Sequence, residues 1–221
     1  MRNQIKNRYL NLELKEFEKI RSEGSRPSLL MHTCCGVCAC YPINLLTEYF
    51  DLTLYFNNDN IYPFEEYQRR FDELVRYVDD FNSTHENRVK IIKTDYDGEN
   101  YLEKISPLKD EPEKGARCLL CYRLRMEQAI QYAVENGYDY FTTVMTISRQ
   151  KDSQALNKIG ESLQEKYPQI RYFFSDFKKQ GGLEKGNQIA NDFGMYRQSY
   201  CGCLYSYESS LHRSDNHNHP S

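Results

Sequence analysis

Short apolar runs alternate with longer amphipathic stretches along most of the chain. Apolar runs of four to six residues are typical of strands, and apolar positions recurring every three or four residues are typical of helices. Five strands are predicted from this pattern, at residues 28–32, 51–56, 89–93, 140–145 and 171–174. Five helices are predicted before and between them, at residues 5–23, 41–50, 64–87, 118–136 and 152–166.

The alternation of strands and helices predicts the fold class. It indicates an α/β domain with a mostly parallel sheet flanked by helices, in a Rossmann-like or HUP-like three-layer arrangement. Functional sites in such domains gather outside the carboxyl ends of the strands. A cysteine-rich segment, residues 33–38, directly follows the first predicted strand. We therefore expect a metal site at this edge of the sheet.

The pattern also divides the chain into three parts. Residues 1–26 are predicted to form a peripheral helix that ends at Gly24 and Pro27, and residues 27–208 one catalytic α/β domain. Residues 209–221 are predicted to be a disordered polar tail. Three histidines in this tail offer weak metal binding as the alternative.

The composition bears on nucleic-acid binding and on the cellular compartment. The 221 residues carry a net charge of -3, so any contact with nucleic acid must come from local basic patches. No apolar run approaches the roughly 20 residues needed to span a bilayer, and the N-terminus is charged and helical, unlike a signal peptide. We therefore expect a cytoplasmic protein without a membrane partner.

The eight cysteines suggest metal or redox chemistry, because a cytoplasmic chain of this size does not need a disulfide framework. They fall into three clusters far apart in sequence, which implies one site in space. The clusters are Cys34, Cys35, Cys38 and Cys40; Cys118 and Cys121; and Cys201 and Cys203. Thiolates suit iron–sulfur clusters, zinc and copper(I), and a cube of four irons needs four of them. The chain has more cysteines than one such cube needs, which suggests a second metal or thiols with a catalytic role.

The surroundings of each cluster refine this interpretation. Cys118 and Cys121 open a predicted helix, whose dipole stabilises thiolate charge. Gly202 lets the backbone fold tightly between Cys201 and Cys203. Adjacent side chains of an extended segment point in opposite directions, so the two cysteines 34 and 35 are candidates for different metals. His32 is either a metal ligand or a hydrogen-bonded residue at a strand end, and Cys40 is either functional or an inert buried thiol.

Several known motifs are missing. The chain has no HExxH, no Walker sequence and no zinc-deaminase pattern. An SGGxDS-like phosphate loop does not follow the first predicted strand, which weighs against an ATP-dependent thiol enzyme acting on tRNA. The main alternative is a non-catalytic zinc-thiolate protein that binds RNA, with its thiolates only holding loops.

A series of sequence blocks resembles the QueH family of epoxyqueuosine reductases. In chain order the blocks are LeuLeuMetHisThrCysCysGlyValCys (29–38), AsnAspAsnIleTyrPro (58–63), GluTyr…Arg (66–69), ArgCysLeuLeuCysTyrArgLeuArg (117–125), PheThrThr (141–143), AspPheLysLys (176–179) and TyrArgGlnSerTyrCysGlyCysLeuTyrSer (196–206). The chain departs from the family's pattern at 36–37, with Gly-Val in place of Ala-Pro, and at Asn57 and Asp59, in place of tyrosine and proline. All the thiols remain, so these departures affect the expected shape of the substrate loop.

The resemblance implies an oxidoreductase that reduces epoxyqueuosine to queuosine at the wobble position of tRNA. It also implies a 4Fe-4S cluster with a separately coordinated iron beside it, no cobalamin, and an external electron donor of unknown identity. Deoxygenation of an epoxide to an alkene takes two electrons and two protons and releases water. A single 4Fe-4S cluster usually cycles by one electron, so a second metal or stepwise delivery is needed.

These considerations give a set of candidate site residues. The predicted metal ligands are Cys34, Cys35, Cys118, Cys121, Cys201 and Cys203, with Cys38 possible. The predicted catalytic residues are Cys35 and Asp176, the latter as a carboxylate near the iron or a proton donor, with a helix N-cap as its alternative role. The predicted substrate-binding residues are Asn58, Asn60, Tyr62, Arg123, Arg197 and Tyr200, because RNA loops are bound by aromatic stacking and basic side chains.

Overall fold

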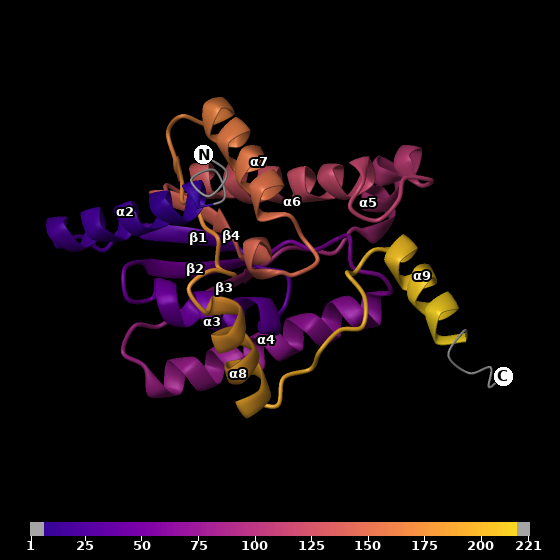
Figure 1. The fold of residues 1–221 in the computed structure, drawn as a ribbon, viewed down its shortest axis with the longest axis horizontal. Helices are drawn as coiled ribbons and strands as arrows, with labels where there is room; N and C mark the ends of the chain where they lie inside the picture. The colour runs from indigo at the N-terminus through magenta and orange to yellow at the C-terminus, as the bar shows by residue number, and fades with distance from the viewer. Residues whose placement is uncertain (1–6, 216–221) are drawn as a thin grey trace.

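A computed structural model describes residues 7–215, and its centre is a five-stranded parallel sheet (Figure 1). The strand order is β3-β2-β1-β4-β5. The strands are β1 (Ser28–His32), β2 (Asp51–Phe56), β3 (Lys90–Lys93), β4 (Tyr140–Thr143) and β5 (Arg171–Tyr172). The parallel α/β fold predicted from the sequence is confirmed.

The strands read as continuous apolar runs because helices cover both faces of the sheet. Leu29 and Met31 belong to the core cluster on one face, whereas Leu30 belongs to the cluster on the other. This alternation follows from the two-residue period of a strand.

Helices form the two outer layers (Figure 1). One face carries α3 (Gly36–Leu46), α4 (Phe64–Thr84) and α8 (Gly182–Asp192), and the other carries α6 (Ala116–Glu135) and α7 (Ser153–Lys166). The N-terminal helix α2 (Arg8–Glu23) packs Phe17 and Ile20 into the first core cluster. No helix among residues 7–215 is long and apolar enough to cross a membrane.

Several boundaries differ from the sequence prediction. Helix α3 begins at Gly36, not at residue 41, and therefore includes Pro42 in its interior. The sequence suggested a later start because proline favours the first turn of a helix. Strand β4 ends at Thr143, whose side chain accepts a hydrogen bond from the Met145 amide and turns the chain into a 3₁₀ helix, Val144–Ile147. Strand β5 is shortened to two residues.

The sequence pattern did not predict helices α5, α8 and α9. Helix α5 spans Gly98–Ile105 and is capped by Asp97, and α9 spans Leu204–Asp215. Helix α9 continues through residues 209–215, which were predicted to begin the polar tail. The rest of that predicted tail, with two of its three histidines, lies outside the described residues.

The topology fixes where a site forms. From β1 the chain builds β2 and β3 to one side, and β4 then returns to the other side of β1. Such a switch in strand order leaves a crevice beyond the carboxyl ends of the two central strands. The cysteine-rich segment 33–38 follows β1 and residues 144–151 follow β4, so both segments border this crevice.

Candidate metal centre

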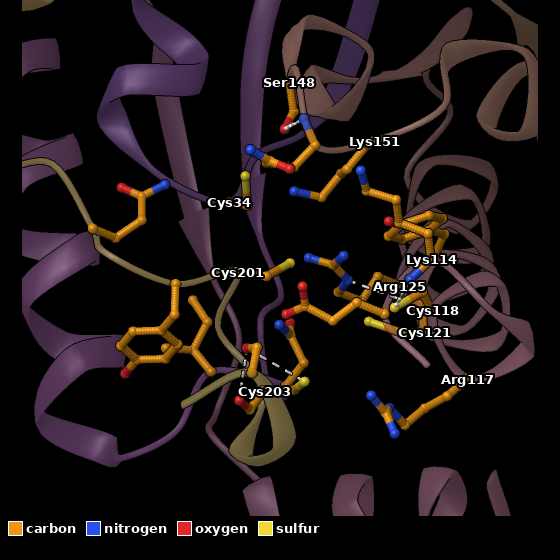
Figure 2. A pocket seen from close by; sticks show the side chains of 18 of the residues that line it. Cys34, Lys114, Arg117, Cys118, Cys121, Arg125, Ser148, Lys151, Cys201 and Cys203 are labelled. Atoms are coloured by element: carbon orange, nitrogen blue, oxygen red, sulfur yellow. Dashed lines mark hydrogen bonds between the residues drawn. The ribbon is translucent and has the colours of Figure 1, made fainter. Parts of the chain in front are cut away.

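A cavity of about 290 Å³ beyond the carboxyl ends of β1 and β4 collects thiols from all three cysteine clusters (Figure 2). Its lining includes six of the eight cysteines, namely Cys34, Cys38, Cys118, Cys121, Cys201 and Cys203. They come from the loop after β1, the start of α3, the start of α6 and the loop before α9. Segments separated by more than 160 residues thus contribute soft ligands to one space.

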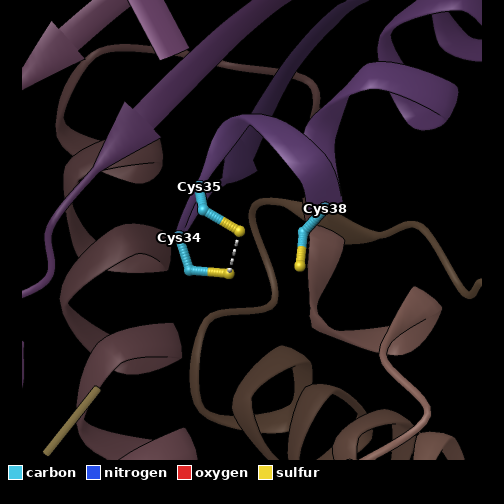
Figure 3. A group of neighbouring side chains, drawn as sticks. All are labelled: Cys34, Cys35 and Cys38. Carbon is cyan, nitrogen blue, oxygen red and sulfur yellow. Dashed lines mark hydrogen bonds between the residues drawn. The ribbon is translucent and has the colours of Figure 1, made fainter. Parts of the chain in front are cut away.

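Three thiols are close enough to hold one metal ion (Figure 3). The sulfur atoms of Cys34, Cys35 and Cys38 all lie within 4.8 Å of one another, and those of Cys34 and Cys35 are 3.9 Å apart. The expectation that the two adjacent side chains point in opposite directions is therefore wrong. Strand β1 ends at His32 and α3 begins at Gly36, so Cys34 and Cys35 lie in the connection between them and not in a regular strand, although Cys35 itself has an extended backbone.

The local electrostatics favour a thiolate at Cys35. Hydrogen bonds from Cys34 and Cys38 lower the pKa of Cys35. The contact with Cys35 raises the pKa of Cys34, and contacts with Cys34 and then Cys35 raise the pKa of Cys38. Cys35 is also the N-cap of α3, where free amides and the helix dipole stabilise negative charge. The side-chain amide of Gln198 donates a further hydrogen bond to the Cys35 sulfur at 3.2 Å.

The second cluster lies in the first two turns of α6, where the sequence predicted a helix to begin. The backbone amide of Lys114 donates to the Cys118 sulfur at 3.3 Å. Burial raises the pKa of Cys118, and the nearby thiols of Cys121, Cys201 and Cys203 add to the increase. All four of these cysteines line the same cavity.

The third cluster depends on the conformation of Gly202. Its φ of +143° lies in a region that favours glycine, and a Cβ there would come within 3.1 Å of the Asn60 side chain. The Gly202 carbonyl accepts a hydrogen bond from the Tyr62 amide at 2.8 Å, and its own amide donates to the Ser206 hydroxyl at 3.2 Å. The glycine therefore turns both neighbouring cysteines towards the site.

A buried ion pair on α4 holds the same loop. The Arg70 guanidinium is 2.8 Å from the Glu66 carboxylate and donates to the carbonyls of Cys201, at 3.0 Å, and Tyr200, at 3.2 Å. Glu66 also accepts a hydrogen bond from the Tyr196 hydroxyl at 2.8 Å. Sequence analysis missed Arg70, because an arginine on a charged helix is more often a solvated residue.

Two cations face the thiols directly. Burial lowers the pKa of Lys151, but the charges of Cys201, Cys34 and Cys38 outweigh this effect and raise it. The pKa of Arg125 is likewise raised against burial, chiefly by Cys121 and Tyr101. Arg125 is held by hydrogen bonds to Asn58 and Met145. Both cations stay charged and offset the negative charge of the thiolates.

The structure places three of the predicted substrate residues at cavities and three elsewhere. Asn60 and Tyr200 line the thiol cavity, and Tyr62 lines a neighbouring one. The other three make internal contacts: Asn58 with the Thr33 carbonyl, Arg123 with Ser162 and Glu127, and Arg197 with Asn187 and Asn191. Arg123 and Arg197 lie within cysteine-containing sequence blocks, but this does not bring their side chains into the cavity lining.

Cys40 and His32 are buried outside the lining of the thiol cavity. The Cys40 thiol donates to the carbonyls of Val37 and Gly186, each at 3.4 Å, and burial raises its pKa to about 11. His32 contacts the Thr143 hydroxyl through Nδ1 at 2.9 Å, and burial lowers its pKa to about 3. Neither residue lines the thiol cavity.

Asp176 lies away from the thiol cavity, next to α2. Its backbone amide donates to the Glu13 carboxylate at 2.9 Å, and both side chains are buried. Burial raises the pKa of Asp176, and it raises that of Glu13 to about 7, with the Asp176 charge adding to the increase. Asp176 is not a helix N-cap, since Gly181 is the N-cap of α8.

The raised pKa of Glu13 leads to a prediction about stability. Because the folded pKa of about 7 exceeds the ordinary value of 4.5, the free energy of unfolding falls as the pH rises through this window, by about 3 kcal/mol. Glu13→Gln stays neutral and keeps an acceptor for the Asp176 amide. Urea unfolding at pH 5 and pH 8 should therefore show a smaller loss of stability in this variant than in the wild type. Glu18→Gln, an exposed change on the same helix, should keep the wild-type slope, and an unchanged slope in Glu13→Gln would contradict the prediction.

Comparison with known proteins gives consistent matches. A family model described as epoxyqueuosine reductase QueH matches residues 29–209. The epoxyqueuosine reductase QueH of Streptococcus pyogenes serotype M1 is 41% identical over 184 residues, which cover 83% of this chain and 72% of that protein. That of Staphylococcus epidermidis is 38% identical over 208 residues, covering 91% and 87%. That of Thermotoga maritima is 29% identical over 185 residues, covering 81% and 90%.

The fold and the site define an α/β protein with a thiol-lined cavity at the switch point of a parallel sheet, beside three cysteines that could hold a metal ion. Within that class, the matches show a particular family. The chain belongs to the QueH family of epoxyqueuosine reductases, and the resemblance drawn from its sequence blocks is confirmed. It is accordingly an oxidoreductase.

Proposed function

We propose that this protein reduces epoxyqueuosine to queuosine at the wobble position of tRNA in the cytoplasm, using a 4Fe-4S cluster and an adjacent iron. The observation that carries the proposal is the convergence of three distant cysteine segments in one cavity, in a chain of the QueH family. Six or seven thiols exceed what one cluster needs, which supports a second metal.

The donor set fits such a centre. The proposed ligands are the six cysteines predicted from the sequence, joined by Cys38, which lies within 4.8 Å of Cys34 and Cys35. Cys35 is the thiol most readily ionised within that trio, and a thiol must be deprotonated to bind a metal. Lys151 and Arg125 offset the accumulated negative charge, which a buried site of several thiolates requires.

The protein's own residues bind the substrate and supply positive charge. A bound 4Fe-4S cluster would supply electrons from an external donor, and an adjacent iron would supply a Lewis acid for the epoxide oxygen. Lys151 keeps a positive charge in the cavity where that oxygen leaves with its electron pair. Asn60 and Tyr200 line the same space and contact the substrate.

The reaction can be tested directly on tRNA. Anaerobically purified, metal-loaded protein is reduced chemically and incubated with tRNA that carries epoxyqueuosine, and the released nucleosides are measured by mass spectrometry. We expect the wobble nucleoside to lose the mass of one oxygen atom. Heat-denatured protein with the same reductant is the matched control, because it measures chemical reduction without the enzyme.

Two outcomes would contradict the proposal. If reduced and fully metal-loaded protein left epoxyqueuosine unchanged, the proposed reaction would be rejected. A colourless, zinc-loaded preparation that binds tRNA and retains full reductase activity would reject the iron–sulfur centre while keeping the reaction. The proposed centre should instead give brown protein with broad absorption towards the blue.

A further inference from the structure

A second cavity, of about 480 Å³, adjoins the thiol cavity. Residues 59–64, residues 96–105 and the start of α9 form its wall. Asn60, Ile105 and Cys203 line both cavities, so one occupant can extend from the second cavity to the thiols. The proposed reaction assigns no role to this second cavity.

Aromatic side chains form part of its wall. Tyr62 is 42% exposed and Phe64 is 50% exposed, and both are among the few large apolar side chains of the described chain that reach solvent to this extent. The Phe64 and Tyr96 rings pack with centroids 5.2 Å apart. Exposed aromatic rings beside a cavity are what an unpaired nucleic-acid base stacks on.

The polar part of the wall is acidic. Asp59, Asp97 and Glu99 line the cavity, whereas none of its lining residues within the described chain is a lysine or arginine. Phosphate is therefore repelled, and hydrogen-bond donors are favoured. Asp97 caps α5 through Asn100, and Asp59 accepts a hydrogen bond from the Asp97 amide at 3.2 Å through Oδ1. Oδ2 of Asp59 and the Glu99 carboxylate are therefore the acceptors most available to a ligand.

A buried amide oxygen points to a missing donor at the junction of the two cavities. Asn60 is 5% exposed, and its Oδ1 has no hydrogen-bond partner among residues 7–215. Buried polar atoms in folded proteins are nearly always paired, and an unpaired acceptor costs free energy. A ligand N–H group entering from the second cavity would satisfy it.

We propose that the second cavity is a base pocket, which receives the guanine-type base of the wobble nucleotide after it leaves the anticodon stack. This inference rests on the proposed function. Epoxyqueuosine is a guanosine derivative, so the edge of its base carries N–H and amino donors that match Asp59 and Asn60. Tyr62 and Phe64 stack on the base, and its substituent passes Cys203 to reach the thiols.

The volumes agree with this division of the substrate. The thiol cavity of about 290 Å³ also has to hold the metal centre, so it leaves room for a small ring and not for a nucleotide. The base pocket of about 480 Å³ lies within the range of roughly 300–1,000 Å³ that is usual for small-molecule sites.

The test compares binding of two RNAs that differ only at the wobble position. Labelled anticodon stem-loops with guanosine or adenosine there are titrated against metal-loaded protein, and binding is followed by fluorescence anisotropy. Wild-type protein should prefer the guanosine stem-loop, because adenosine presents a different edge. Asp59→Asn should reduce this preference by about tenfold, the size expected for losing a paired contact to a base edge. Asp79→Asn, the same change on an exposed site of α4, should leave it unaltered.

The outcomes separate this inference from the proposed reaction. Equal binding of the two stem-loops by the wild type, or an unchanged preference in Asp59→Asn, would overturn the base pocket even if epoxyqueuosine is still reduced. Conversely, if the reduction assay failed, the proposed reaction would be rejected, but the preference for the guanosine stem-loop could still be measured. Circular dichroism and metal content of Asp59→Asn should match the wild type, and Tyr62→Ala provides a second variant, expected to weaken binding of both stem-loops through lost stacking.

Discussion

Replacing Cys118 by alanine should abolish the brown colour and most of the bound iron. Cys118 lines the thiol cavity, and its sulfur accepts a hydrogen bond from the Lys114 amide, which stabilises a thiolate. We expect the rate of epoxyqueuosine reduction to fall by more than about a hundredfold, since loss of an outer-shell partner alone costs about 10- to 100-fold. Iron content, the visible spectrum and the tRNA assay measure the effect.

Cys40→Ala is the matched control for this experiment. The Cys40 thiol is buried between α3 and α8, donates to two backbone carbonyls and does not line the cavity. Its replacement should leave iron content and rate unchanged and lower the free energy of unfolding by about 1 kcal/mol. Retained colour and activity in Cys118→Ala, or lost iron in Cys40→Ala, would show that the thiols are assigned to the wrong roles.

The sequence predicted the fold and the approximate place of the site because both depend on regular patterns. The run 28–32 is a buried parallel strand, and the cysteines that follow it lie where parallel strands end. Topology then brings distant segments to that edge, as the three cysteine clusters in one cavity illustrate. None of these inferences required the direction of an individual side chain.

Side-chain directions limited the prediction of the substrate residues. Arg197 lies within the same sequence block as Cys201, yet it contacts Asn187 and Asn191 on α8, a helix that the apolar pattern did not predict. Asp176 likewise follows β5 in sequence, but its partner is Glu13 of the N-terminal helix. Such contacts depend on packing between elements distant in sequence, which periodicity does not encode.

The positioning role of Arg70 illustrates the same limit and leads to the second large prediction. Arg70→Met leaves Glu66 charged and buried without its partner, which should cost about 3–5 kcal/mol of stability. It also removes the donors to the carbonyls of Tyr200 and Cys201, so the loop that carries Cys201 and Cys203 loses its anchor. We therefore expect iron to be released to a chelator much faster than from the wild type.

A double variant separates loop positioning from general stability. Glu66→Gln combined with Arg70→Met removes the buried charge, so the free energy of unfolding should largely recover, whereas iron release should stay fast because the two carbonyls still lack a donor. Lys19→Met, on α2, breaks a partly exposed ion pair with Glu16 and should change stability by less than about 1 kcal/mol, with normal iron retention. If iron retention instead recovered together with stability in the double variant, Arg70 would act only through the fold, because a positioning role requires the donors themselves.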